Sequence, residues 1–195
     1  EGFFSVPAGT GFAAAPGLLQ GGANYGCSVR LPDGRLELCP ALGVWEWDER
    51  GLPVFGDGHV PVLVHEFTHA FANPVIDAQW SELEPAMTRV FARVRATMEA
   101  RAYPDPKIVA QESLVRACVV RFAAATRGPD GAREQEREEV EQGFAWTPEL
   151  ARLLIQYEQA RERYPTLDSF APLLAEFFGG VADQLEEQAE RAPKV

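Results

Sequence analysis

V-P-V-L-V-H-E-F-T-H-A-F-A-N-P, residues 60–74, is the stretch on which the interpretation of the whole chain depends. It contains His65, Glu66 and His69 as an H-E-x-x-H pattern inside an apolar run of helical length. Because positions four apart lie on one face of a helix, both imidazoles can reach the same metal ion. Glu66 is rotated by about 100° from His65, so its carboxylate can stand beside the ion. This arrangement is typical of a zinc site that activates water.

The sequence around the motif supports a helix. Pro61 suits the first helical position, where a missing N–H is tolerated, and Asn73-Pro74 predicts its end because the residue before proline avoids the α region. An apolar stripe for burial is formed by Leu63, Phe67, Ala70 and Phe71. The alternative is a pair of ordinary core histidines without metal. We favour zinc, because two of the three histidines in the chain have this spacing and a buried polar trio needs partners.

The length and composition predict one soluble globular domain spanning residues 1–195. Hydrophobic residues make up 46% of the chain and charged residues 24%. The net charge of −11 and the absence of a basic stripe argue against nucleic-acid binding. No apolar run of 18 residues or more exists, so we expect no transmembrane segment.

The first residue and the cysteines bear on localisation. The chain begins with Glu1, so we expect it to be processed or trimmed, with any signal peptide upstream. Cys27 and Cys39 flank a predicted hairpin and could pair, whereas Cys118 lies in an apolar helical pattern and is expected to be a buried thiol. These features favour an exported protein.

The pattern changes from strands to helices along the chain. Residues 1–56 predict a small, mainly antiparallel sheet, with strands near 21–29, 35–39 and 44–47 and turns at 32–34 and 51–53. The rest, residues 60–192, is expected to be mostly helical, with helices ending near Ala100, at 106–126, a solvated charged helix at 133–142, and helices at 147–163 and 173–192. Asp105 is a candidate N-cap before Pro106, and residues 128–131 form a turn. The fold class is therefore α+β.

Catalytic zinc needs a third protein ligand. Glu112 is the best candidate, because an acid in the middle of an otherwise apolar helix needs a partner. The alternative is an ion pair with Arg116, four residues on along the same face. Both can hold, since a ligating carboxylate is usually fixed by further hydrogen bonds. His59 is too close in sequence, on the loop that leads into the motif helix.

These residues carry a resemblance. His65-Glu66-Phe67-Thr68-His69 followed by Glu112 on a later helix resembles the gluzincin type of zinc peptidase. The chain also resembles a bacterial domain-of-unknown-function family of H-E-x-x-H proteins that are predicted to be peptidases and are often exported. The shared stretches are Asn24-Tyr25-Gly26, 70–74, 112–117, 143–146 and 157–165. The resemblance implies one zincin-like domain with zinc as its cofactor and a peptide or protein as its substrate.

A catalytic mechanism follows as an expectation. His65, His69 and Glu112 would hold zinc, and Glu66 would act as general base toward water. Tyr103 and Tyr157 are candidate oxyanion donors, with Arg116 a weaker one; each could instead be a packing or supporting residue.

The substrate is expected to lie along a strand edge above the motif helix. The stretch around Asn24, Tyr25 and Gly26 could supply that edge by strand addition. The alternative is a tight turn with Tyr25 packed on the core.

Three functions remain: a zinc endopeptidase or aminopeptidase, a zinc hydrolase of a non-peptide bond, and a non-catalytic zincin-like binding module. The presence of Glu66 favours the first.

Overall fold

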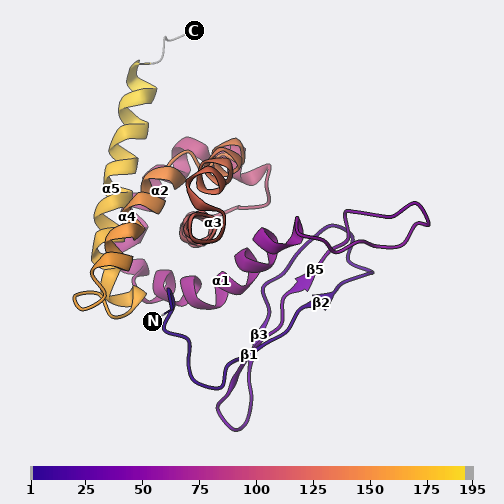
Figure 1. The fold of residues 1–195 in the computed structure, drawn as a ribbon. Helices are drawn as coiled ribbons and strands as arrows, with labels where there is room; N and C mark the ends of the chain where they lie inside the picture. The colour runs from indigo at the N-terminus through magenta and orange to yellow at the C-terminus, as the bar shows by residue number, and fades with distance from the viewer. Residues whose placement is uncertain (1, 192–195) are drawn as a thin grey trace. The chain divides into compact units, whose positions relative to one another are not determined.

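A computed structural model describes residues 2–191 and shows a mixed α+β chain (Figure 1). The strands are β1 (Gly11–Phe12), β2 (Ala15–Pro16), β3 (Ser28–Arg30), β4 (Leu36–Leu38) and β5 (Ala41–Leu42). The helices are α1 (His59–Ala78), α2 (Trp80–Glu99), α3 (Pro106–Glu141), α4 (Thr147–Gln159) and α5 (Leu167–Arg191). The chain forms two compact units, residues 1–71 and 72–195, which are described separately here.

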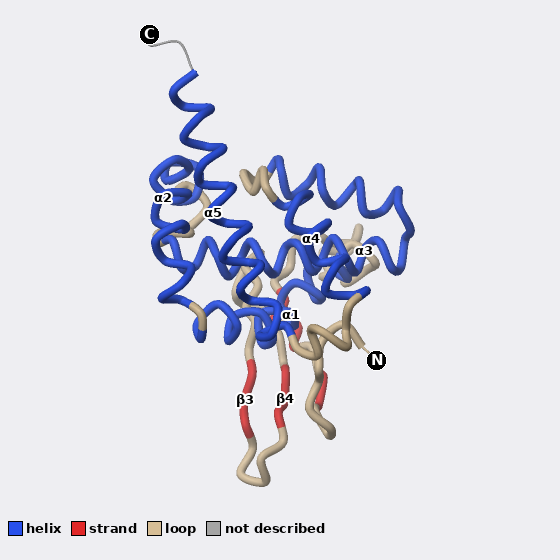
Figure 2. Tube along the Cα trace, turned by 90° about the vertical axis from the view of Figure 1, so that its left-hand side faces the viewer, coloured by secondary structure: helices blue, strands red, loops and turns tan. Residues whose placement is uncertain are grey.

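The first unit contains short strands that pair around the segment formed by β4 and β5. β3 and β4 form the predicted antiparallel hairpin (Figure 2), closed by a turn in which Gly34 has a positive φ of 85°. The prediction of a mainly antiparallel sheet is wrong in one respect, because β1 pairs with β4 and β2 with β5 in parallel. The N-terminal segment runs in the same direction as β4, and long connections make such pairing possible.

The third predicted strand, residues 44–47, is not formed. The chain there makes one isolated bridge, between Trp47 and Pro53, around the predicted turn at Gly51. The strand forms earlier instead, at β5, because Ala41 pairs on both sides, with Ala15 and with Tyr25. The hairpin also brings Cys27 opposite Cys39, whose N–H donates to the Cys27 carbonyl at 2.8 Å. Their thiols are free.

Helix α1 begins two residues before Pro61 and continues past Pro74, where the sequence predicted its end. Pro74 cannot donate a hydrogen bond to the preceding turn, but it lies on the exposed side of the helix. Val75 and Ile76 after it are almost fully buried, 2% and 0% exposed. Their burial stabilises a helix that the proline alone would stop.

The second unit is helical. Asp105 caps α3 as predicted, accepting hydrogen bonds from the N–H groups of Lys107 and Ile108. Gly128, with a φ of 69°, interrupts the helix inside the predicted turn cluster. Arg116 and Glu139 then meet across a separation of 23 residues, so α3 is a helical hairpin.

Helices α2, α4 and α5 complete the second unit. The largest fully buried side chains include Tyr157, Phe144, Phe170 and Phe178. On the surface, Arg89 of α2 pairs with Asp183 and Glu186 of α5 at 2.6 and 2.5 Å. The C-terminal helix α5 starts at Leu167, earlier than predicted, because its first turns are also apolar and buried. None of the helices in residues 2–191 is both long enough and apolar enough to cross a membrane.

Candidate metal centre

Helix α1 presents the two motif histidines to each other. The Nε2 atoms of His65 and His69 lie 3.2 Å apart, and both rings are half-buried. Two nitrogen ligands at about 2.0–2.1 Å from a tetrahedral zinc would be separated by about 3.3 Å. The imidazoles therefore already have nearly the separation that a shared zinc ion requires.

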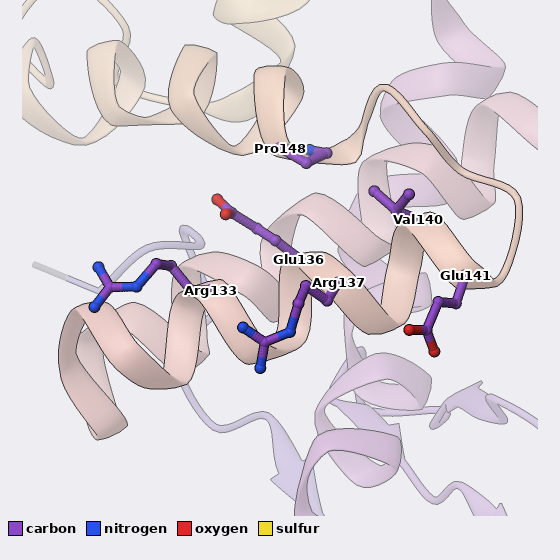
Figure 3. A pocket seen from close by; sticks show the side chains of 6 residues that line it. All are labelled: Arg133, Glu136, Arg137, Val140, Glu141 and Pro148. Carbon is purple, nitrogen blue, oxygen red and sulfur yellow. The ribbon is translucent and has the colours of Figure 1, made fainter.

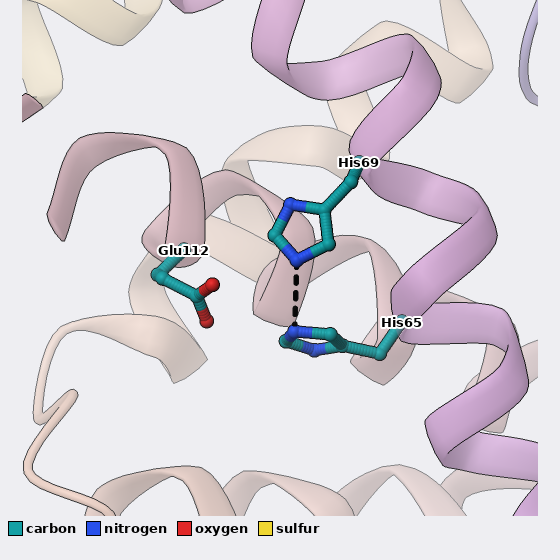
Figure 4. Close-up of side chains that lie close together, drawn as sticks. All are labelled: His65, His69 and Glu112. Carbon is teal, nitrogen blue, oxygen red and sulfur yellow. Dashed lines mark hydrogen bonds between the residues drawn. The ribbon is translucent and has the colours of Figure 1, made fainter. Parts of the chain in front are cut away.

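Glu112 of α3 completes a group of three possible ligands (Figure 4). One ligand atom from each of His65, His69 and Glu112 lies within 4.8 Å of the others. Among the described residues this is the set of three or more His, Cys, Asp or Glu side chains that could hold a metal ion.

The chemistry of these ligands suits a divalent metal. Two imidazole nitrogens and one carboxylate oxygen are a three-ligand set that leaves a tetrahedral position for water or substrate. Glu112 is 7% exposed, so its carboxylate would reach a metal from a buried position. The residues present therefore fit a divalent metal ion such as zinc.

Arg116 lies beside Glu112 and is shared with a second acid. Its Nη2 is 3.2 Å from a Glu112 oxygen, and its Nη1 donates to Glu139 at 2.5 Å. Burial acts to lower the pKa of Arg116, but the charges of the Glu139 and Glu112 carboxylates outweigh it and raise that pKa. The guanidinium stays charged. The ion pair considered as an alternative for Glu112 is thus observed, and Glu112 is at the same time part of the group of three possible ligands.

The two candidate tyrosines lie in different surroundings. Tyr103 accepts a hydrogen bond from Arg116 at 2.9 Å, and burial together with the negative charge of Glu112 raises its pKa. It remains a neutral phenol next to a candidate ligand. Tyr157 is fully buried, with its ring against Phe170 and the Arg161 guanidinium. This burial favours a packing role for Tyr157, and Tyr103 is the better placed of the two.

The predicted substrate-binding stretch lies on the motif helix. A Cβ atom added to Gly26 would come within 2.8 Å of the Glu66 carbonyl and 3.3 Å of the His69 Cβ. Asn24 accepts a hydrogen bond from the Gly43 N–H at 3.0 Å and so holds this loop. Tyr25 is 56% exposed, so the alternative in which it packs on the core is not observed.

Glu66 itself is 8% exposed and lies close to this loop. Its Oε2 would be 3.4 Å from a Cβ at Gly26. The general-base candidate is therefore enclosed between its own helix and a glycine backbone. A larger residue at this point of the loop would push against both the carboxylate and the helix.

His59 was predicted to precede the motif helix, and it is the first residue of α1. Its ring stacks on Trp45 at 4.0 Å between centroids, and its Nδ1 accepts from the Gly56 N–H. It is not part of the three-residue group. Its role is to anchor the start of the helix.

Sequence reasoning missed two residues in the charged segment after Gly128. Gln135 and Glu139 are 5% and 4% exposed, although the segment was predicted to be solvated. The signal was present: a turn centred near Gly128 makes the two helical segments antiparallel, which places Glu139 opposite Arg116. A buried arginine then selects one acid from the many in this run.

Two surface hollows lie elsewhere in the second unit. One, of about 400 Å³, is lined by Arg133, Glu136, Arg137, Val140, Glu141 and Pro148 (Figure 3). The other has a similar volume and includes Trp146, Glu149 and Phe177. Neither hollow includes a residue of the H-E-x-x-H motif.

Comparison with known proteins gives a family without an assigned activity. Residues 10–177 match the family model described as "Domain of unknown function (DUF4932)". Searches of curated proteins and of solved structures found no match. The matched range includes the motif, Glu112 and Glu139.

Proposed function

The chain belongs to the family described as domain of unknown function DUF4932, and we propose that it is a zinc metallopeptidase. Three candidate ligands and one adjacent carboxylate support this proposal. The finer assignment that we propose is a zincin-like domain of the gluzincin type, with two histidines from the motif helix and a glutamate from a later helix as ligands.

The observation that carries the proposal is the approach of His65, His69 and Glu112 to within 4.8 Å of one another. The sequence spacing alone favours the histidine pair, but Glu112 is 43 positions beyond His69 along the chain. The sequence separation alone therefore does not predict this approach. Three ligands with an open fourth position are the arrangement of catalytic zinc sites, whereas structural sites are closed by four protein ligands.

The residues around the ligands have roles that hydrolysis requires. Zinc bound there would lower the pKa of a water molecule and polarise a carbonyl group. Glu66 lies next to His65 in the motif and can accept the proton of the attacking water and return it to the leaving amine. Tyr103, kept protonated, can donate a hydrogen bond to the oxygen that gains charge.

A peptide fits the edge of the sheet in the first unit. Tyr25 and Ala41 exchange both backbone hydrogen bonds, each 3.0 Å long. Because hydrogen-bonded and non-hydrogen-bonded pairs alternate along an antiparallel ladder, the N–H and C=O groups of Gly26 and Ser28 point away from β4. β3 is the outer strand of its sheet. A substrate strand can pair there, next to Glu66 and His69.

We propose further that the substrate is a peptide or protein met outside the cytoplasm. The free thiols of Cys27 and Cys39 lie opposite each other, where an oxidising compartment would allow them to pair. The net charge of −11 does not suit a nucleic-acid substrate.

The first test is the metal content of the purified protein, compared between the wild type and two variants. About one zinc per chain in the wild type, lost in both His69→Ala and Glu112→Ala, is the expected result. Zinc lost in His69→Ala and kept in Glu112→Ala would remove Glu112 from the ligand set. No zinc in the wild type after zinc is added back would overturn the proposed function.

The second test separates catalysis from binding. Glu66→Gln should keep the metal and lose hydrolysis of a peptide library, because the amide cannot accept a proton. Glu46→Gln, a substitution of the same kind outside the motif, is the matched control and should cleave as the wild type does. A zinc-loaded wild type that ignores all peptides would favour a non-peptide substrate or a non-catalytic module.

A further inference from the structure

Arg116 bridges two buried carboxylates of the helical hairpin. It contacts Glu112 at 3.2 Å and Glu139 at 2.5 Å, and its side chain is 11% exposed. The guanidinium also lies 4.4 Å from the centroid of the Phe144 ring. The two acids and one base in this space carry a net charge of −1.

Glu139 is held in place by its own partner. Gln135, one turn earlier, donates a hydrogen bond to the second Glu139 oxygen at 2.9 Å. Both residues are buried, and both come from the segment after Gly128. One oxygen of Glu139 therefore faces Arg116 while the other is fixed by Gln135, so this carboxylate has a defined orientation.

We propose that Glu139 is a positioning residue for the metal site, which holds Arg116 away from full pairing with Glu112 and so limits the competition of Arg116 with the metal for that carboxylate. This inference rests on the proposed function. An arginine can form two parallel hydrogen bonds with a single carboxylate. In the structure the two terminal nitrogens of Arg116 instead contact different residues. Nη1 donates to Glu139, while Nη2 donates to Tyr103 and contacts Glu112.

Loss of Glu139 should weaken metal binding in two ways. The guanidinium would be released to engage both oxygens of Glu112 and would compete with the metal for them. The net charge of the three buried side chains would also change from −1 to 0, so the attraction for a divalent cation would fall. Both effects have the same sign.

The test is the zinc affinity of Glu139→Gln, measured by competition with a chelator of known affinity. We expect the dissociation constant to rise about 10- to 100-fold, as is typical when a residue that supports a metal ligand is lost. The matched control is Glu138→Gln, which removes the same charge from the exposed neighbouring position and should leave the constant unchanged.

A second readout separates positioning from folding. The visible absorption of bound Co²⁺ reports the coordination of the metal, and it should change in Glu139→Gln if Glu112 ligation is disturbed. If Glu139→Gln does not fold, Gln135→Met is the milder variant; it removes one hydrogen bond to Glu139 and should weaken zinc binding in the same direction by a smaller factor.

The outcomes distinguish this inference from the proposed function. A wild type that binds zinc tightly, with an unchanged zinc constant and Co²⁺ spectrum in Glu139→Gln, would overturn the role of Glu139 alone. A lower melting temperature without metal and an unchanged zinc constant would likewise show a purely structural role. Absence of zinc binding by the wild type would overturn both proposals.

Discussion

The two compact units of the chain bury apolar side chains to very different degrees. In the first unit, the buried apolar residues among those described are Leu38, Leu42 and Val44. In the second unit, buried side chains line each helix, and its one exposed large apolar residue among those described is Val140. The other exposed large apolar residues of the described chain all lie in the first unit; they are Val6, Phe12, Leu18, Leu19, Tyr25, Val29, Trp45, Trp47, Leu52, Val54, Phe55 and Val60.

The difference shows that the two units are stabilised by different kinds of interaction. The first unit is ordered by backbone pairing, turns and aromatic contacts such as Phe12 with Phe67. The second is ordered by a helical core, and core burial is the larger source of stability.

The largest expected effect is a cavity in the second unit. Leu154→Ala removes a fully buried side chain and should lower the free energy of unfolding by about 2–5 kcal/mol. Leu19→Ala makes the same chemical change at a fully exposed position of the first unit and should change it by about 0.5 kcal/mol or less. Urea denaturation followed by circular dichroism measures both. Equal effects would contradict the contrast between the units.

A smaller effect is expected where the first unit is tightly packed. Gly26→Ala places a methyl group 2.8 Å from the Glu66 carbonyl oxygen. Because this oxygen belongs to the helix backbone, it cannot move away easily. We expect a loss of about 1–3 kcal/mol together with weaker zinc binding, because the motif helix must shift. Thermal unfolding and chelator competition measure the two. Gly22→Ala is the control, since its methyl would be 4.0 Å from the nearest atom.

The third prediction concerns alkaline pH and the core of the second unit. Burial raises the pKa of Cys118, so the folded state keeps its thiol neutral where the unfolded chain ionises, from about pH 8.5 upward. The contribution of the neutral thiol to the free energy of unfolding is present below that pH. It is lost as the pH rises, by about 1.4 kcal/mol per pH unit. Denaturation at pH 7 and 9.5 gives the free energy of unfolding of the wild type and of Cys118→Ala. We expect this free energy to fall more between the two pH values in the wild type than in the variant. An equal change in both proteins would contradict the prediction.

The smallest expected effect is at the start of α3. Asp105→Ala removes the side chain that accepts from two backbone N–H groups and should destabilise the protein by about 1 kcal/mol. Asp105→Asn keeps an acceptor and should lose much less. Thermal melting distinguishes them, and identical melting temperatures for the two variants would show that the cap is unimportant.

Local patterns predicted the features that depend on neighbours in sequence. The H-E-x-x-H helix, the Asp105 cap, the hairpin turn at Gly34 and the break at Gly128 each have a signal within a few residues. Glu112 was selected because an acid in an apolar helix needs a partner, and it belongs to the group of three possible ligands; its role as a ligand stays a prediction.

The wrong predictions concern features that are determined by contacts between residues far apart in the sequence. Parallel pairing of β1 with β4 joins Gly11 to Glu37, and no local pattern specifies it. Helix α1 continues past Pro74 because residues beyond it become buried. Glu139 resembled its exposed neighbours until the reversal at Gly128 placed it against Arg116.

The short outer strand β3 has a consequence for self-association. An open edge can pair with a second copy of the chain as well as with a peptide. β3 has only three residues, and the last of them, Arg30, is charged, which discourages such pairing between copies. If the proposed function holds, the same shortness would limit a bound peptide to a few main-chain hydrogen bonds. Selection among substrates would then fall to side chains near the bond to be cleaved.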